Sequence, residues 1–226
     1  MRNSVYYLFN LLVLLPPLLI SIFSDVKTYK NWRALGVAIA AVSVPFIVWD
    51  VWAAAQGHWF FSGTYISAPR LFGLPYEEIL FFITVPFAMA FVWDVLKKHI
   101  ASKPVSEILA VTGLGLASLA GFVLTLSQWS RGYSRSAGIA VLISVVAIVV
   151  SGWWRRNVFW WYQLVLVLIF FVANTFLTAL PVITYGDASV TGFRVGTIPL
   201  EDFFFNFALI NMFVLAYDFI ARKTSA

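Results

Sequence analysis

The sequence has no cysteine, only two histidines and very little charge. Of its 226 residues, 11% are Asp, Glu, Lys or Arg and 62% are hydrophobic. A soluble domain carries roughly 25% charged residues, so this chain has too few to cover a surface that faces water. The lack of cysteine excludes a disulfide framework, a thiol nucleophile, a thiolate zinc site and an iron–sulfur cluster. The composition therefore excludes a soluble enzyme, a nucleic-acid-binding protein and a disordered chain.

Sequence motifs for cofactors are also missing. There is no P-loop, and the glycines at Gly113 and Gly115 lack the third glycine and the preceding strand of a dinucleotide-binding motif. His58 and His99 are too few and too far apart for a histidine-based metal site. The last apolar stretch contains no lysine that could form a Schiff base with retinal. We therefore expect neither a cofactor nor a metal.

What the chain does have is long apolar stretches. A membrane-spanning helix needs about 20 mostly apolar residues, and such segments must be helical because lipid offers the backbone no hydrogen-bond partners. The first stretch is expected to be a true span rather than a signal peptide, because only Arg2 precedes it and no small-residue cleavage site follows. The sequence predicts an all-α integral membrane protein with seven transmembrane helices, at Val5–Phe23, Ala34–Ala55, Pro75–Leu96, Val105–Leu126, Ala137–Trp154, Val158–Leu180 and Pro199–Ile220.

The basic residues orient these spans. Ten Lys and Arg residues fall on one side of the predicted membrane and five, including Arg2, on the other. The positive-inside rule then places the N-terminus outside and the C-terminus in the cytoplasm, most simply in the plasma membrane. The net charge of +5 is expected to lie near lipid headgroups rather than to bind nucleic acid.

An internal repeat appears at an offset of 124 residues. The offset carries the first three spans onto the last three, so it predicts two parallel three-helix repeats, residues 1–100 and 131–226, joined by a connector helix in residues 101–130. Asp50 corresponds to Asn174. The residues that match best are Arg70, Pro75, Glu77 and Glu78, which recur as Arg194, Pro199, Glu201 and Asp202.

Each acidic pair follows a proline at the predicted start of a helix. One such pair is typical of an ordinary helix start, where proline fits the first position and acids complement the helix dipole. Two pairs at equivalent places in an acid-poor membrane protein favour a function. One acid from each half could face a shared cavity suited to general acid–base chemistry. Asp50 is equally compatible with a functional and a structural role.

Several residues near the acids are candidates for substrate binding. Aromatic rings at these positions could line an apolar pocket and stabilise a cation, although core packing explains each ring individually. The two arginines could orient the acids or reach the headgroups. His58 fits a polar–aromatic belt better than a proton relay, and Asp94 and Asp218 are expected to form ion pairs with Lys97, Lys98, Arg222 and Lys223. The predicted substrate-binding residues are Phe81, Phe82, Phe203, Phe205, Asn174, Arg70 and Arg194.

The motifs of both halves resemble the membrane-integral lycopene cyclases, which occur as paired small subunits in some bacteria and as fused proteins in archaea and fungi. Tyr76 stands where that family commonly has an aliphatic residue. The first half carries Trp49-Asp50, Gly57-His58-Trp59, Pro75-Tyr76-Glu77-Glu78 and Phe81-Phe82; the second carries Asn174, Thr178, Pro181, Tyr185, Gly192 and Pro199-Leu200-Glu201-Asp202-Phe203.

The resemblance implies a lycopene β-cyclase without a cofactor. Its substrate would be lycopene or a related hydrophobic carotenoid, and its reaction would be protonation of a terminal double bond, ring closure of the carbocation and loss of a proton. The resemblance assigns the acid, base and cation-stabilising roles to Glu77, Glu78, Glu201 and Asp202, with Asp50 as an auxiliary. Two alternatives remain: a small transporter or proton channel that uses the same acids, and a related cyclase that makes ε-rings or acts on an elongated carotenoid.

Overall fold

The computed structural model describes residues 4–67 and 69–224. Within them, seven helical segments are long and apolar enough to cross a membrane, which confirms the predicted all-α membrane fold. The second segment is continuous but contains a π-helical stretch between two α-helices. The segments are α1 (Val5–Phe23), α2–η3–α3 (Trp32–Ala38, Ile39–Ser43 and Val44–Ala55, after η2 at Thr28–Asn31), α4 (Tyr76–His99), α5 (Glu107–Ser127), α6 (Gly132–Ser151), α7 (Asn157–Ala179) and α8 (Leu200–Thr224).

The fifth span differs most from its predicted limits. Helix α6 begins at Gly132, five residues before the predicted start, and ends at Ser151. Gly152 follows with a φ of 72°, a left-handed conformation that ends helices and that glycine adopts without strain. The predicted last residues of this span instead form the short 3-10 helix η4 (Trp153–Arg155).

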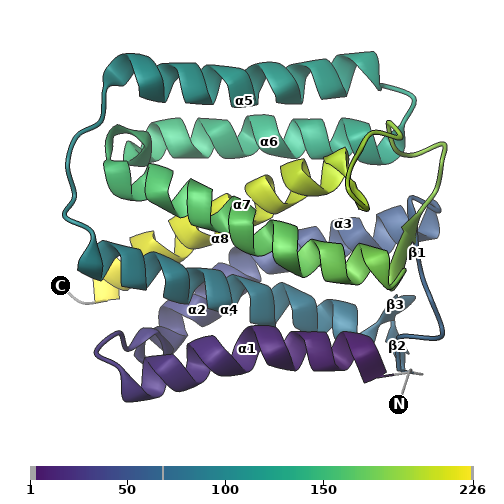
Figure 1. Ribbon diagram of the computed structural model, residues 1–226, viewed down its shortest axis with the longest axis horizontal. Coiled ribbons are helices and arrows are strands. Elements are labelled where there is room, and N and C mark those ends of the chain that lie inside the picture. Colours follow the sequence, from purple (N-terminus) through teal and green to yellow (C-terminus); the bar gives the residue numbers. More distant parts are fainter. Residues whose placement is uncertain (1–3, 68, 225–226) are drawn as a thin grey trace.

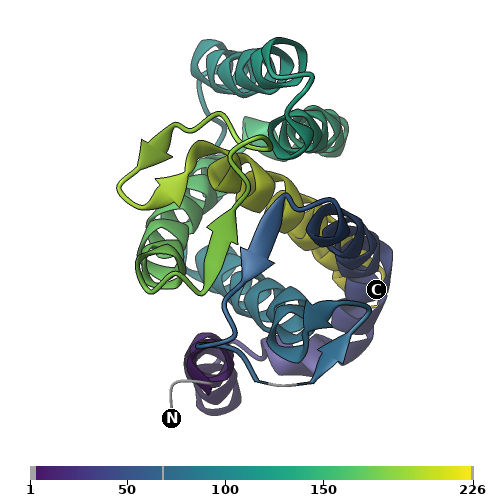
Figure 2. The same ribbon diagram turned by 90° about the vertical axis from the view of Figure 1, so that its right-hand side faces the viewer.

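The helices lie side by side along one direction, with the two ends of the chain at opposite ends of the bundle (Figure 1). Helix α5 packs on α6 and α6 on α8, while α1 packs on α4 at the other edge (Figures 1 and 2). The main core lies between α2, α4, α7 and α8. Fully buried Ala90 and Ala208 lie in this core, and small residues of this kind let membrane helices approach each other closely.

Six short strands cap the end of the bundle near the N-terminus (Figures 1 and 2). Strand β1 (Trp59–Phe61) pairs antiparallel with β4 (Ile183–Tyr185), which joins a loop of the first half to a loop of the second. Two hairpins, β2–β3 (Arg70–Leu71 and Leu74–Pro75) and β5–β6 (Arg194–Val195 and Ile198–Pro199), lead directly into α4 and α8. In the first hairpin Phe72 and Gly73 both have positive φ, as a tight two-residue hairpin turn of type I′ requires.

Local structure around the two acidic pairs recurs at the 124-residue offset. The backbone N–H of Tyr76 donates to the carbonyl of Pro69, and that of Leu200 donates to the carbonyl of Phe193. The two hairpins occupy equivalent positions. These pairs support the internal repeat, while the division into two parallel three-helix halves and a connector, at residues 1–100, 101–130 and 131–226, stays a prediction.

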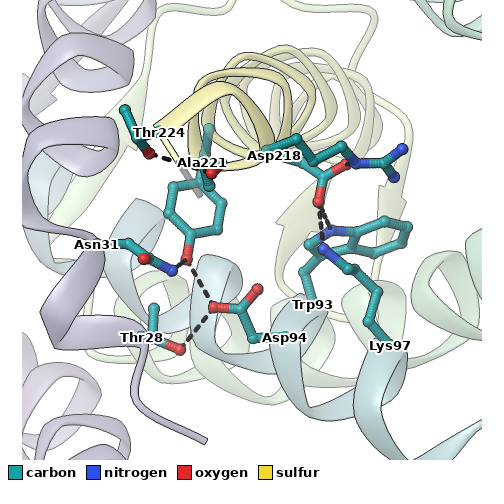
Figure 3. A network of polar contacts seen from close by, with 10 residues as sticks. Thr28, Asn31, Trp93, Asp94, Lys97, Asp218, Ala221 and Thr224 are labelled. Atoms are coloured by element: carbon teal, nitrogen blue, oxygen red, sulfur yellow. Dashed lines mark hydrogen bonds and ion pairs between the residues drawn. The ribbon is translucent and has the colours of Figure 1, made fainter. Parts of the chain in front are cut away.

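The end of the bundle opposite the strands holds a network of polar contacts (Figure 3). Trp93 of α4 donates to Asp218 of α8 at 3.1 Å, and Tyr217 of α8 donates to Asp94 of α4 at 2.6 Å. Each of the two helices therefore supplies one aromatic donor and one acidic acceptor to the contact between them. Both pairs are related by the 124-residue offset.

The predicted ion pairs at this end are only partly present. Asp218 is paired with Lys97 at 2.5 Å and with Arg222 at 2.7 Å, as expected. Asp94 instead accepts hydrogen bonds from Tyr217 and from the hydroxyl of Thr28, at 2.8 Å. The prediction was wrong for the other two lysines: Lys98 pairs with Asp25, and Lys223 lies over the ring of Phe219.

Candidate active site

A cavity of about 70 Å³ opens at the strand-capped end of the bundle. Its walls come from both halves of the chain and include three of the five predicted acids: Asp50 of α3, Glu78 of α4 and Asp202 of α8. The other lining residues are Tyr6, Trp59, Phe81, Tyr133, Phe170, Asn174, Leu177, Ile183, Tyr185, Phe205, Asn206 and Leu209.

Glu78 and Asp50 form a carboxyl pair on one side of the cavity. The hydroxyl of Tyr6 donates to Glu78 Oε2 at 2.6 Å, and the indole of Trp59 donates to Asp50 Oδ1 at 2.8 Å. Both carboxyl groups line the same cavity. Asp50 Oδ2 is buried and has no hydrogen-bond partner among the residues that the structure describes. A hydrogen bond between two carboxyl groups requires a proton on one of them.

Asp202 has a different environment on the other side of the cavity. Its Oδ1 accepts a hydrogen bond from Tyr133 at 2.7 Å, and its Oδ2 accepts from Tyr185 at 2.5 Å and from the amide of Asn174 at 2.8 Å. A carboxylate accepts all three bonds without a proton of its own. Tyr185 lies in strand β4, outside the spans, and burial together with the charge of Asp202 raises the pKa of its hydroxyl, which keeps the donor protonated.

One difference between the two acidic environments is the residue at positions 50 and 174. Asp50 and Asn174 correspond at the 124-residue offset, and each lies beside the second acid of the pair that follows it. Where the first half places a carboxyl next to Glu78, the second half places an amide next to Asp202. Two carboxyl groups can share a proton, whereas a carboxyl group and an amide cannot.

Glu77 and Glu201 do not line this cavity. Each is fully buried and accepts a hydrogen bond at 2.6 Å from the backbone N–H of the loop that precedes its helix, at Ser67 and Thr191. Glu201 also accepts a bond from the hydroxyl of Ser134 at 2.6 Å. Adjacent helical positions point about 100° apart. One acid of each pair therefore faces the cavity while its neighbour fixes the loop.

Comparison with known proteins assigns these motifs to a family. A family model described as lycopene cyclase matches residues 3–96 and 133–220, and each matched segment contains one of the proline–acid pairs. The chain belongs to the lycopene cyclase family. It is an integral membrane enzyme, a carotenoid cyclase, as its motifs suggested. No curated protein and no solved structure matches it.

The aromatic residues predicted to bind substrate in this cyclase take different positions. The side chains of Phe81 and Phe205 line the cavity. Phe82 is fully buried behind the wall, where it packs edge-on against Phe205 with ring centroids 6.4 Å apart. Phe203 lines a neighbouring cleft and packs against Phe170 at 4.9 Å.

The two arginines of the cyclase form hydrogen bonds within their own hairpins rather than with the acids. Arg70 donates to the carbonyl of Gly73 at 2.9 Å, and Arg194 donates to the carbonyl of Thr197 at 2.8 Å. Both bonds lie within the hairpin that carries the arginine. The guanidinium of Arg194 also lies over the ring of Tyr185, 5.8 Å from its centroid, which is its nearest approach to the acid network.

Several residues that line the cavity were not predicted as site residues, among them Tyr6, Tyr133, Tyr185 and Asn206. The ring of Tyr133 lies parallel to Tyr185 at 6.0 Å and edge-on to Trp59 at 4.8 Å. The signal for the tyrosines was present, because Tyr6 and Tyr133 both lie near the start of the first helix of a half. Their separation is 127 residues, so they escape a search at an offset of 124.

His58 lies near the cavity but is not part of its lining. Its ring packs edge-on against Trp52 at 5.1 Å, as in a polar–aromatic belt, and its Nδ1 has no partner among the described residues. Burial and the nearby Arg135 lower its pKa, so the ring is neutral at pH 7. Across residues 4–67 and 69–224, no three His, Asp or Glu side chains are grouped so that they could hold a metal ion.

Proposed function

We propose that this cyclase converts lycopene into a carotenoid with β-ionone rings, by protonation, ring closure and deprotonation. The observation that carries the proposal is the unequal environment of the carboxyl groups in one cavity. In this proposal Asp50 and Glu78 share a proton, because both line the cavity and Asp50 Oδ2 is buried without a partner among the described residues. Asp202, in contrast, accepts hydrogen bonds from three donors. A proton donor and a proton acceptor therefore face the same space, which is the arrangement that acid–base catalysis needs.

In the proposed reaction, the Asp50–Glu78 pair gives its proton to the terminal double bond of the substrate, which forms a tertiary carbocation. The next suitably placed double bond attacks this cation, so that one carbon–carbon bond forms and the positive charge moves into the new ring. The Asp202 carboxylate then takes a proton from a ring carbon, which restores a double bond. Return of that proton to the pair completes an isomerisation that consumes no other reactant.

The cavity walls suit a cationic intermediate. The rings of Trp59, Tyr133 and Phe205 line the space beside the acids, and the faces of such rings attract cations. Tyr6, Tyr133 and Tyr185 direct their hydroxyl hydrogens to carboxyl oxygens, so their oxygen atoms are less available to trap the cation. Glu77 and Glu201 serve in this proposal as positioning residues that fix the loops over the cavity.

The proposal includes an orientation in the plasma membrane. The excess of basic residues at the end that carries Lys97 and Arg222 favours a cytoplasmic position for the C-terminus and an outer position for the N-terminus and the cavity. Arg2, which was counted for this orientation, lies outside the described residues. The family match supports an enzyme over the transporter or channel that the sequence left open.

The test is expression in cells that accumulate lycopene, followed by identification of the pigment. We expect β-ring products from the natural chain, and none from Glu78→Gln or Asp202→Asn when these variants are present in the membrane at normal amounts. Glu77→Gln is the matched control, because it changes the adjacent acid, which lies outside the cavity.

Three results would contradict parts of the proposal. Absence of any cyclic carotenoid from the natural chain would overturn the lycopene assignment. An ε-ring product, or conversion of an elongated carotenoid alone, would overturn the ring type or the substrate. Full activity in both Glu78→Gln and Asp202→Asn would overturn the assignment of the cavity acids.

A further inference from the structure

An apolar groove extends from the acid cavity along helix α7. We call it the α7 groove; α1, α4 and α7 form its walls. It shares Phe81, Phe170, Asn174, Leu177 and Asn206 with the lining of the cavity, so the two spaces adjoin each other. In the end-on view, α1 and α7 are neighbours on one edge of the bundle, and α4 lies nearer its centre (Figure 2).

The groove runs along the helix axes. Its lining residues on α7 run from Leu166 to Leu177, ~16 Å at the helical rise of 1.5 Å per residue. On α4 they run from Phe81 to Met89. The groove therefore reaches from the acid cavity to about the middle of the spans.

The chemistry of the lining identifies the class of ligand. All of its side chains are apolar except Asn174 and Asn206, and both of these also line the cavity. Away from the cavity, the groove offers neither charge nor side-chain hydrogen-bonding groups. Such a lining fits a hydrocarbon chain and does not fit an ion, a peptide or a sugar.

The seam between α1 and α7 gives the groove a route to lipid. Phe9 of α1 stacks on Phe176 of α7 with ring centroids 6.0 Å apart and an interplanar angle of 12°. Phe176 is 42% exposed on the lipid-facing side of the bundle. Aromatic side chains that only stack across a seam can part by changes of rotamer, without loss of hydrogen bonds.

We propose that the α7 groove binds the linear polyene chain of the substrate, which enters sideways from the bilayer between α1 and α7, while one end group lies among the acids. This inference rests on the proposed carotenoid substrate. It adds the binding site for the unreactive part of that molecule. Because a long chain held in the groove leaves only one end in the cavity, the two ends of a symmetrical carotenoid react in separate binding events.

A second cleft lies on the other side of α7, towards α5 and α6. It shares only Phe170 and Asn206 with the acid cavity, and its lining includes Ala117, Val141 and Phe203. Its weaker continuity with the acids favours the α7 groove as the site of the chain.

The test fills each space separately with a large side chain. Ala173→Trp fills the α7 groove, Ala117→Trp fills the second cleft, and Val172→Trp, which is adjacent to Ala173 but 72% exposed, is the matched control. Lycopene bound to the purified proteins in detergent is measured by its absorbance, and turnover is measured in proteoliposomes. We expect Ala173→Trp to lower both binding and kcat/KM by about tenfold or more, because an extra ring cannot share a filled groove with a ligand.

A second measurement separates the groove from general damage to the fold. A shorter acyclic polyene with the same end group would not reach the far part of the groove, so its turnover is expected to fall less than that of lycopene in Ala173→Trp. Equal loss for both substrates, an unaffected Ala173→Trp, or loss confined to Ala117→Trp would overturn the groove. Failure of the proposed function is distinguishable, because the natural chain would then neither bind nor cyclise lycopene.

Discussion

In the proposed mechanism Asp50 and Glu78 share a proton, and this proton can be removed by a substitution that preserves the hydrogen-bonding groups. In Asp50→Asn, the amide oxygen can still accept the bond that Trp59 donates at 2.8 Å, and the amide nitrogen can donate to Glu78. Glu78 would then have two donors, the amide and Tyr6, and would need no proton. The variant should fold normally, with a free energy of unfolding within about 1 kcal/mol of the natural protein, because no buried group loses its partner.

Its activity should fall steeply. General acid catalysis contributes roughly 10²–10⁴-fold to the rate of such a step, so kcat for ring formation in proteoliposomes should fall at least about 100-fold, which corresponds to about 2.7 kcal/mol in the activation free energy. Binding of lycopene, measured by absorbance, should change little. Activity above half of the natural value in a correctly inserted Asp50→Asn variant would refute the reasoning about the shared proton.

Exchanging the residues at positions 50 and 174 tests the same reasoning more stringently. Asn174→Asp alone replaces the amide that donates to Asp202 at 2.8 Å with a second carboxyl, so the cavity would hold two carboxyl pairs and Asp202 would lose one of its three donors. In the double variant with Asp50→Asn, the shared proton moves to the second half and Glu78 becomes the acceptor. We expect the double variant to be more active than the less active of the single variants; strictly additive losses would contradict a reciprocal role of the two halves.

Three further variants separate positioning, hydrogen bonding and stability. Glu77→Gln keeps an acceptor for the N–H of Ser67, so activity in cells should fall by less than about tenfold, the effect of one weakened neutral hydrogen bond; complete loss would make Glu77 a reactive acid. Tyr185→Phe removes a bond to Asp202 of about 2 kcal/mol, or roughly 30-fold in kcat. Because the pKa of Tyr185 is raised above its usual value of 10.0, the natural enzyme should lose no activity to ionisation of this tyrosine as the pH rises to 10. A fall in activity below pH 10 in the pH profile of the natural enzyme, absent in Tyr185→Phe, would contradict this. Asp218→Asn should lower the free energy of unfolding by about 2 kcal/mol, which is less than the loss of a fully buried ion pair costs because Lys97 and Arg222 are partly exposed. The inserted variant should turn over substrate normally. An unchanged melting temperature would refute this prediction.

The spans, and the approach of the two proline–acid motifs to one cavity, could be predicted from the sequence. Lipid imposes a length and a composition on every spanning helix, so the seven stretches are visible without any tertiary information. The repeat then directs attention to the acids at the starts of α4 and α8. The prediction included Asp50 and Asn174 because they correspond at the same offset.

The division of labour within each pair could not be predicted. Whether Glu77 or Glu78 faces the cavity depends on the rotation of α4, which the packing of α1 and the β2–β3 hairpin fixes. In an apolar chain the hydrophobic pattern carries little information about which face is buried, since lipid and core select the same residues. The antiparallel pairing of β1 with β4 was also invisible, because each strand has only three residues and finds its partner more than 120 positions away.

The amide at Asn174 gives the chain an advantage that a symmetric assembly would lack. Two identical halves around a twofold axis would have the same residue at positions 50 and 174, so both sides of the cavity would hold a shared proton or neither would. Joining the halves in one polypeptide permits each to carry its own residue. A nearly symmetric cavity can then give a proton from one wall and accept one at the other.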